Sequence, residues 1–477
     1  MNKSYYNTAN SSLWLFTLAV FCALILPRLV QDGMFLDGIF YAAISRNLAH
    51  HLGTFWNPHY SNTFYPSLHE QPPLMFWLQA QFFRLLGDSM YVERIYSLLT
   101  AIITALGINL IWKELSYHKP EIKQYGWLPV LFWIIVPICF WSYVNNLEEC
   151  TMSLFDVFAV YFIIKSLNQT NKIPLLLISG GFILLASLTK GPQGLFPLCI
   201  IIVRYFTHKD ISFKRTLIYS VVLVLLPAII YTYFYTNPII RESYHQYFLR
   251  RFVLTFNNNN QTTNFRLYLL FRLIGELTPA LLLTGISMIF ARKKIIVKEF
   301  FHDHKRDFYF FLFIGLSASL PLMITLEQRG FYLTTSFPYF AIAFALIVVP
   351  FIYYQINLLT NKFIKGFKVL SLVMLIVVIL TTFSAIGKTK RDEDMLHDIY
   401  LMGKEIPPRT VISVDRDLFY NWSLHAYLQR YFHISLDEDT LRNYHLIEKI
   451  NLNPKSIPNN YSKINLPTTK YDLYHRK

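Results

Sequence analysis

The sequence FLDGIFY occupies residues 35–41, directly after the first apolar run of the chain, and HEQPPL follows at residues 69–74. Both stretches belong to a polar and aromatic segment, 35–86, that differs from what comes after it. From there to about residue 387 the chain consists of long apolar runs separated by short loops. The segment therefore places acidic residues on one face of a membrane, and this is where we look for chemistry.

The composition supports a membrane protein, because 54% of the 477 residues are hydrophobic and only 15% are charged. Soluble domains usually carry about 25% charged residues. Apolar runs of roughly 17 to 23 residues are long enough to cross the hydrocarbon core of a bilayer. About eleven such spans are predicted, near 12–30, 92–112, 126–143, 149–167, 173–189, 193–207, 216–235, 267–290, 308–325, 332–352 and 367–387.

The basic residues predict the orientation of these spans. Lysine and arginine gather in alternate loops, which the positive-inside rule assigns to the cytoplasm together with the N-terminus. The 31–91 segment, the 236–266 loop and the C-terminal tail are then outside. The net charge of +15 is explained by these loops, and no basic stripe or motif supports nucleic-acid binding. We interpret the first run as an anchor that stays in the mature protein.

The tail has a different composition, since from about residue 388 charged residues become more frequent and long apolar runs disappear. Residues 410–414 and 433–436 have the composition of strands, and 418–431 has the pattern of an amphipathic helix. We expect a membrane domain at 1–387, with 31–91 as its first extracytoplasmic loop. A small α/β domain at 388–477 would follow outside, and we expect it to help recognise an acceptor.

Asp37 is the first candidate for chemistry. A carboxylate that stays ionised within reach of a hydroxyl or amine can act as a general base. The following apolar positions, Tyr41 among them, make an amphipathic helix that would hold Asp37 at the membrane surface. The alternative is a solvated charge at the interface.

His69 and Glu70 stand directly before the double proline that begins the next predicted helix, an interfacial helix ending near residue 86. They are either a turn that caps this helix or the wall of a site that orients a substrate. A divalent metal bound by Glu70 with His69 or His245 is a further possibility. A zinc site usually needs three or four ligands, so no cofactor is predicted with certainty.

Several cations lie on the side of the membrane that should be poor in them. Lys190, Arg251 and Arg329, the last close to Tyr332, all fall in predicted outer segments. An anionic partner explains them, and phosphate suits both the bidentate guanidinium and the point charge of lysine. Snorkelling of Lys190 to the interface is the alternative. Glu149 is either a plain loop residue or a second acidic wall that contacts the substrate.

With these residues in place, the chain resembles the bacterial glycosyltransferases of families 39 and 83. This group contains protein mannosyltransferase-like enzymes and lipid A aminoarabinose transferases. The resemblance covers roughly residues 30–340 and depends on the order of its motifs. These are Asp37, EQPPL at 70–74, Glu93-Arg94, LTKGP at 188–192, and Tyr332 followed by Pro338.

The resemblance implies an all-α polytopic membrane protein with the type C (GT-C) fold. Interfacial helices lie in its first extracytoplasmic loop, and a small C-terminal α/β domain lies outside. Asp37 matches the catalytic acid of that loop, and Glu70 matches the acid before the double proline. Tyr332 and Arg251 match positions near the carrier phosphate. Gln71 stands where the aminoarabinose transferases carry a lysine, so we place it on the phosphate side without assuming their substrate.

The activity implied is transfer of a hexose or pentose from a polyprenyl-phosphate carrier. The acceptor would be a glycolipid such as lipid A, a polysaccharide or a protein, on the periplasmic face of the bacterial inner membrane. The partners are then the lipid-linked donor, the acceptor and membrane lipid. We expect inversion, with Asp37 as the general base, Glu70 as the second catalytic residue, and His69, Glu149 and Tyr41 contacting the substrate.

The residues alone are compatible with two other functions. The first is a transporter or flippase of lipid-linked sugars, which would also need outward cations and acids in the membrane. Such proteins typically show paired repeats and helices broken at the midplane, and the sequence shows neither. The second is a non-catalytic membrane assembly protein, which would tolerate Asp37→Asn.

Overall fold

The computed structural model describes residues 3–256, 261–289, 294–451 and 460–477. Its contacts divide the chain into two compact units. We call the first, 1–28 with 97–144 and 148–384, the membrane unit. The second, 29–96 with 145–147 and 385–477, is the loop–tail unit, because it joins the first long loop to the C-terminal tail. The predicted division at residue 387 stays a prediction.

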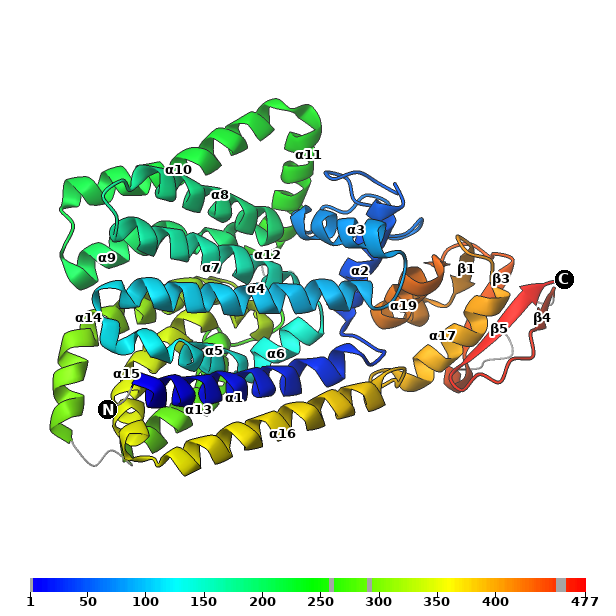
Figure 1. Ribbon diagram of the computed structural model, residues 1–477. Helices are drawn as coiled ribbons and strands as arrows, with labels where there is room; N and C mark the ends of the chain where they lie inside the picture. Colours follow the sequence, from blue (N-terminus) through cyan, green and yellow to red (C-terminus); the bar gives the residue numbers. More distant parts are fainter. Residues whose placement is uncertain (1–2, 257–260, 290–293, 452–459) are drawn as a thin grey trace. The chain divides into compact units, whose positions relative to one another are not determined.

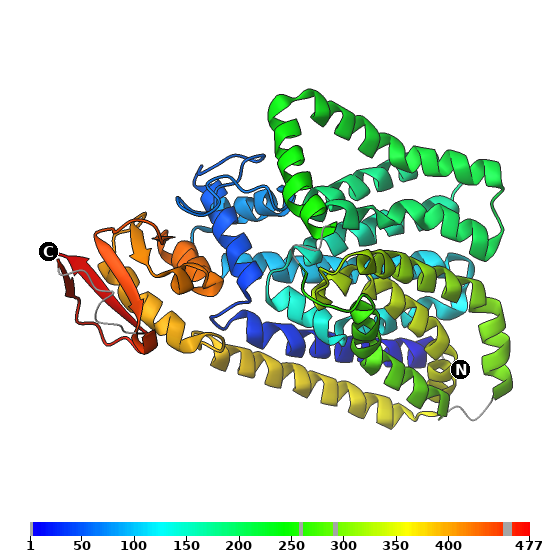
Figure 2. The same cartoon turned by 180° about the vertical axis from the view of Figure 1, so that it is seen from behind.

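The long helices of the membrane unit run side by side (Figure 1, Figure 2). The main helices, three of which begin or end just inside the loop–tail unit, are α1 (Lys3–Leu29), α4 (Val92–Leu115), α5 (Trp127–Ile134), α6 (Pro137–Val144), α7 (Glu148–Leu167), α8 (Ile173–Lys190), α9 (Ile200–His208), α10 (Phe213–Thr236), α13 (Tyr268–Ile289), α14 (Lys294–Ser319), α15 (Phe337–Leu358) and α16 (Asn361–Ala385). Shorter turns are η1 (Ser116–His118), η2 (Pro120–Tyr125), η3 (Gly191–Cys199), α11 (Pro238–Tyr247), η4 (Phe248–Val253), α12 (Leu254–Phe256), η5 (Leu320–Ile324) and η6 (Gly330–Thr335).

By length and hydropathy, nine helical stretches in the described part of the chain can each cross a membrane. The helices α5 and α6 form a pair bent by 76° at its break, which is either a broken tenth span or a re-entrant loop. Pro137 begins α6, and because proline has no N–H to donate and clashes with the preceding turn, the helix cannot continue straight through it.

One of the nine stretches, 173–208, reverses its direction after α8. Gly191 has a φ of +73° and ends α8. A Cβ on Gly194 would lie 2.5 Å from the carbonyl carbon of Ala186, so η3 folds back against α8. The described residues thus contain nine candidate spans, or ten if the bent pair is one span, where the sequence predicts about eleven.

The loop–tail unit contains the two helices predicted in the first loop, α2 (Leu36–Ala49) and α3 (Leu74–Leu86). Its tail contains α17 (Glu393–Glu405), β1 (Val411–Val414), α18 (Arg416–Phe419), α19 (Trp422–Phe432), β2 (Ser435–Asp437), β3 (Tyr444–Glu448), η7 (Lys449–Asn451), β4 (Tyr461–Lys463) and β5 (Tyr471–Arg476). The predicted strands near 410–414 and 433–436 and the helix near 418–431 are therefore present, within a few residues.

The five strands form one sheet in the order β2-β1-β3-β5-β4. β1 pairs in parallel with β2 and β3, with Ile412 opposite Leu436, and β5 pairs antiparallel with β3 and β4. On α17, the Asp398 carboxylate accepts backbone N–H bonds of 2.7 to 2.9 Å from residues 469–471 and so fixes the start of β5. These bonds outweigh burial and lower the pKa of Asp398.

The core of this unit mixes residues from both of its sequence segments. Met34 and Ile39 from the first loop are buried in one apolar cluster with tail residues such as Leu396, Leu424 and Leu436. The first loop and the tail therefore share one hydrophobic core, beside a second cluster made by the first loop and the start of α4.

Candidate functional site

Asp37 lies in the first turn of α2 and is partly exposed. A negative charge is favoured there, because the unpaired N–H groups make a helix N-terminus electropositive. Phe35 precedes the helix and provides no side-chain cap. The position of Asp37 therefore depends on what anchors the backbone around it.

Two asparagines from another part of the chain provide that anchorage. The Asn145 side chain accepts a 2.8 Å hydrogen bond from the N–H of Phe35, and Asn146 donates one of 3.1 Å to the carbonyl of Gly38. Gln79 on α3 in turn donates a 2.8 Å bond to Asn146. The backbone on both sides of Asp37 is thus held by neutral amide groups.

Gly38 is required for this close approach. A Cβ at this position would stand 1.8 Å from the carbonyl oxygen of Asn145. Asn146 has a φ of +53°, a conformation that asparagine adopts more readily than most residues. Asparagine and glycine therefore allow the 145–147 segment to lie directly on the first turn of α2.

Glu70 and His69 lie in a turn whose polar groups bond within the turn. The hydroxyl of Tyr65 donates to the Glu70 carboxylate, and the Ser67 hydroxyl lies 2.9 Å from Nε2 of His69. The cap position of α3 is Pro73, which makes no side-chain cap bond. Both the capping turn and a partly exposed wall, to which Gln71 also belongs, are compatible with this geometry.

Tyr41 is only 5% exposed. Its ring packs 5.7 Å from that of Phe76, in an apolar cluster of the first loop. This burial gives Tyr41 a packing role, and its predicted contact with substrate stays a prediction.

In the membrane unit, Lys190 ends α8 beside the first turn of α7. Its Nζ lies 2.8 Å from Oε1 of Glu149 and 3.3 Å from Oε2 of Glu148. Both glutamates are fully buried, and the lysine side chain is 6% exposed. Snorkelling to the interface is thus the wrong description of Lys190, because its charge is enclosed with two carboxylates.

Tyr332 and Arg251 extend this network. Lys190 Nζ lies 5.3 Å from the centre of the Tyr332 ring, and the Tyr332 hydroxyl donates a 3.2 Å bond to Glu327. Arg251 pairs with Glu327 at 2.6 Å and lies 3.5 Å from the Tyr332 hydroxyl. Arg251 belongs to the π-helical turn η4, and such turns occur often at functional sites.

The network has a formal charge of −1, because the two cations Lys190 and Arg251 face the three carboxylates of Glu148, Glu149 and Glu327. We call these five residues with Tyr332 the ion network. The Arg251 side chain, 27% exposed, is the cation of the network that a ligand can reach. Arg329 is exposed in the segment before η6, and among the described residues no ion pair of Arg329 is found.

The structure thus gathers four predicted site residues, Glu149, Lys190, Arg251 and Tyr332, into the ion network. It places Asp37, Tyr41, His69, Glu70 and Gln71 in the loop–tail unit. Sequence reasoning missed Asn145, Asn146 and Gln79 as anchors of α2. The only sequence feature that marks them is the pair of adjacent asparagines before two glutamates, and this pattern is typical of an ordinary loop.

A metal site finds no support in the described residues, where no group of three or more histidine, cysteine, aspartate or glutamate side chains could hold an ion. His245 is exposed on α11 in the membrane unit, and Glu70 lies in the loop–tail unit. The residues present do not fit a metal, and no step below involves one.

Comparison with known proteins bears on the family and the fold of the chain. Residues 70–234 match the sequence model of the dolichyl-phosphate-mannose-protein mannosyltransferase family. ArnT from Cupriavidus metallidurans bound to undecaprenyl phosphate superposes with a TM-score of 0.65 at 13% identity, covering 96% of each chain. Its apo form gives 0.63 at 12% identity, covering 96% of this chain and 95% of that one.

The archaeal oligosaccharyltransferase AglB from Archaeoglobus fulgidus, in complex with an inhibitory peptide and a dolichol-phosphate, is also similar. The TM-score is 0.52 at 13% identity, over 89% of this chain and 64% of that one. A search of curated proteins found no matching sequence.

The chain is therefore a multi-pass membrane protein with the GT-C fold. More particularly, the family match and these structures confirm the resemblance to glycosyltransferases of the polyprenyl-phosphate-dependent families 39 and 83.

Proposed function

We propose that this protein transfers a sugar from a polyprenyl-phosphate carrier to an acceptor outside the cytoplasmic membrane. The observation that carries the proposal is the GT-C fold along the whole chain, together with the mannosyltransferase family match over 70–234. Two of the similar structures hold a polyprenyl phosphate, undecaprenyl phosphate in ArnT and dolichol-phosphate in AglB, and a lipid carrier of this chemistry is the proposed donor here.

In the proposed reaction, Asp37 accepts the proton of an acceptor hydroxyl or amine as that group attacks the anomeric carbon. The bond between that carbon and the phosphate oxygen breaks on the opposite face, and the electron pair leaves with the phosphate. The products are the glycosylated acceptor, with inverted configuration, and the polyprenyl phosphate. A carboxylate is suited to this base role because it is ionised at neutral pH.

The phosphate gains negative charge as its bond to the sugar breaks. Preorganised cations at that position stabilise the transition state more than the ground state. We assign this role to Arg251 and Arg329 as direct contacts and to the buried Lys190 through its charge alone, with Tyr332 and Gln71 as neutral donors. The acids of the ion network hold Lys190 and Arg251 in fixed orientations, so little reorganisation is needed during transfer. Glu70 and His69 are assigned to the acceptor side, with Glu149 and Tyr41 as further substrate contacts.

The acceptor is a surface glycolipid, a polysaccharide or a protein, and the proposed location is the inner membrane with the site facing the periplasm. Because Gln71 replaces the lysine of the aminoarabinose transferases, we do not assume that aminoarabinose is the donor sugar. Mass spectrometry of the surface glycolipids and glycoproteins identifies the substrate, by comparing a deletion strain with the same strain carrying the wild-type gene. A single sugar missing from one acceptor is the expected difference.

Asp37→Asn tests the mechanism in the same strain. We expect it to remove the same sugar, with a loss of transfer of about a hundredfold to ten-thousandfold, while the protein accumulates normally in the membrane. Asp394→Asn is the matched control, because Asp394 is an exposed acid in the first turn of α17 in the same unit. If Asp37→Asn restores the sugar as well as the wild type does, Asp37 is not the base.

A further inference from the structure

The tail holds the chain just before α2 through Asp32. The Asp32 backbone N–H donates a 2.9 Å bond to the carbonyl of Lys388, and its carbonyl accepts one of 3.3 Å from Lys390. Its carboxylate accepts hydrogen bonds from the hydroxyls of Tyr400 at 2.6 Å and Tyr431 at 2.8 Å. The start of the segment that leads to Asp37 is thus bound to α17, to α19 and to the chain preceding them.

A second attachment lies three residues before Asp37. The Tyr427 hydroxyl on α19 accepts a 2.9 Å hydrogen bond from the N–H of Met34 and lies 2.9 Å from the carbonyl oxygen of the same residue. It also lies 3.1 Å from the Asp392 carboxylate, the alternative acceptor for its proton. Met34 is 1% exposed, so water cannot replace this bond to its backbone.

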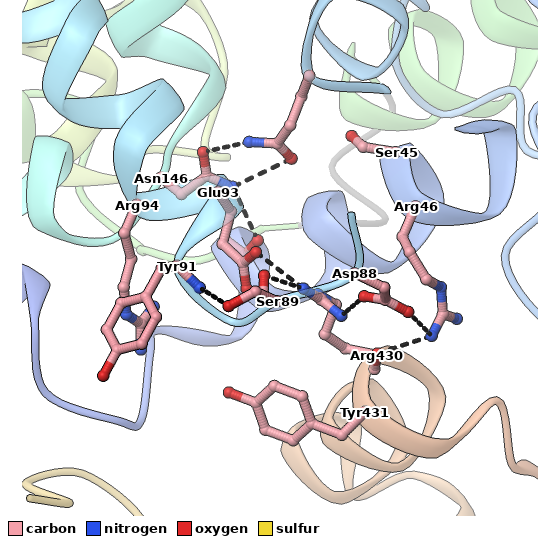
Figure 3. Close-up of polar contacts among 12 residues, drawn as sticks. Ser45, Arg46, Asp88, Ser89, Tyr91, Glu93, Arg94, Asn146, Arg430 and Tyr431 are labelled. Carbon is pink, nitrogen blue, oxygen red and sulfur yellow. Dashed lines mark hydrogen bonds and ion pairs between the residues drawn. The ribbon is translucent and has the colours of Figure 1, made fainter. Parts of the chain in front are cut away.

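The far end of α2 is attached through a buried charge cluster (Figure 3). Arg46 donates 2.7 Å hydrogen bonds to the carbonyls of Gln429 and Arg430 on α19. The Arg430 guanidinium pairs with Asp88 at 2.6 Å and with Glu93 at 2.9 Å. Both arginines are fully or almost fully buried. Asp88 lies two residues after the end of α3, and Glu93 lies in the first turn of α4. The cluster therefore ties α2, the connection from α3 to α4 and α19 together.

Apolar packing lies between these polar attachments. Ile39, two residues after Asp37, is fully buried in the core shared with the tail. At Gly33 (φ +84°) an added Cβ would stand 2.4 Å from the carbonyl oxygen of Arg391. From residue 32 to residue 46 the tail thus contacts the segment before, beside and after Asp37.

We propose that the C-terminal tail is a clamp for α2, and that Tyr427 is a positioning residue for Asp37. This inference rests on the proposed role of Asp37 as the base. This role of the tail differs from recognition of the acceptor, because the buried polar groups of the tail bind the first loop. A base must be held within a fraction of an ångström of the position from which it can accept the proton of the attacking group. Misplacement by about 1 Å can lower the rate about a hundredfold.

The first experiment needs no substrate. Hydrogen–deuterium exchange of the whole protein in lipid nanodiscs is compared for the wild type, Tyr427→Phe and the control Tyr420→Phe. Tyr420 is an exposed tyrosine of the same unit. Because Tyr427→Phe removes the buried acceptor of the Met34 N–H, we expect exchange in peptides covering residues 32–38 to accelerate at least tenfold. Tyr420→Phe should leave these peptides unchanged, and unchanged exchange in Tyr427→Phe would overturn the clamp.

The second experiment asks whether Tyr427 acts through Asp37. The readout is the sugar that the deletion strain lacks, measured on cells with equal amounts of each variant in the membrane. We expect Tyr427→Phe to lower transfer about tenfold to a hundredfold and Tyr420→Phe to have no effect. In an Asp37→Asn background, Tyr427→Phe should cause no further loss, because the group that it positions is already absent.

The outcomes separate this inference from the proposed function. If Tyr427→Phe reduces the residual transfer of Asp37→Asn by the same factor as it reduces wild-type transfer, Tyr427 does not act through Asp37 and the positioning role is wrong. If Asp37→Asn itself transfers normally, the proposed base is wrong, whereas accelerated exchange at 32–38 would still show that the tail holds α2.

Discussion

The helix that carries Asp37 and the lysine that ends α8 are held by opposite kinds of interaction. Around the first turn of α2, the anchors are the neutral amides of Asn145 and Asn146 and the phenol of Tyr427. Around Lys190, the anchors are two fully buried carboxylates. The amides fix the backbone on both sides of Asp37, whereas the carboxylates fix the charge of Lys190.

This difference predicts different tolerance to substitution. A neutral hydrogen bond contributes about 1 kcal/mol, and its loss costs about 1 to 3 kcal/mol when the remaining group is buried. Removing one member of a buried ion pair costs about 3 to 5 kcal/mol, because the other charge stays behind. The ion network should therefore be the more fragile region, and the surroundings of α2 the more adjustable one.

Lys190→Met gives the largest expected effect. It leaves Glu148 and Glu149 buried without their cation, so the free energy of unfolding should fall by about 3 to 5 kcal/mol. The melting temperature of the full-length protein in detergent, followed by size-exclusion chromatography, measures this. The triple variant with Glu148→Gln and Glu149→Gln should recover most of the stability without recovering transfer.

Lys365→Met is the control for that substitution, since Lys365 is exposed on α16 and should change the melting temperature little. If the single variant Lys190→Met has the same melting temperature as the wild type, the two carboxylates do not depend on the lysine. The proposed difference between the two regions would then be wrong.

Gly38→Ala tests the neutral side and should have an intermediate effect. Its Cβ would stand 1.8 Å from the Asn145 carbonyl oxygen, so α2 must move away from the 145–147 segment at a cost of about 1 to 3 kcal/mol. Because this displacement acts on the turn that carries Asp37, transfer should fall more than stability does. Gly366→Ala on α16, where no atom lies within 4 Å, should be neutral or slightly stabilising. Normal transfer by Gly38→Ala would show that the close contact is dispensable.

His425→Leu gives the smallest effect and tests a buried neutral group in the same unit as the first turn of α2. Neither ring nitrogen of His425 has a hydrogen-bond partner among the described residues, and Tyr60, Phe64 and Phe419 surround it at ring distances of 5.4 to 6.1 Å. Leucine should therefore raise the free energy of unfolding by about 1 kcal/mol at pH 7.

The same variant has a pH signature. Burial lowers the pKa of His425 to about 4 from an ordinary 6.5, so the unfolded chain binds the proton more readily than the folded one. The wild type should lose stability as pH falls from 6.5 toward 4, by about 2 kcal/mol between pH 7 and pH 5 from this group. Between pH 7 and pH 5, the melting temperature of His425→Leu should therefore fall less than that of the wild type. An equal loss in both proteins would assign the acid sensitivity elsewhere, for example to His433, whose pKa burial also lowers to about 4.

The passes of the membrane unit could be predicted from the sequence because length and hydropathy are local properties. The reversal after Lys190 could be predicted too, since Gly191 and Pro192 interrupt two apolar runs. The bend between α5 and α6 was missed, because Ile135 and Val136 continue the apolar run and Pro137 alone marks the break.

The candidate site was predictable only as a set of residue types. Acids and cations on the outer side of a membrane stand out by charge, which identified Asp37, Lys190 and Arg251. Their partners did not stand out. Tyr427 occupies an ordinary position in an amphipathic helix, and its bond to Met34 joins residues 393 positions apart. No periodicity or spacing encodes such a contact, so the union of the first loop with the tail emerges only from the structure.

That separation of 393 positions has a consequence for biosynthesis. A ribosome that adds roughly 5 to 20 residues per second needs about 20 to 80 seconds between Met34 and Tyr427. During this interval the first loop has been made, but the tail that completes its core has not. Partly synthesised chains should therefore be inactive even after all their membrane helices are in place, and the cell acquires a working copy only when the last strands have folded onto the first loop.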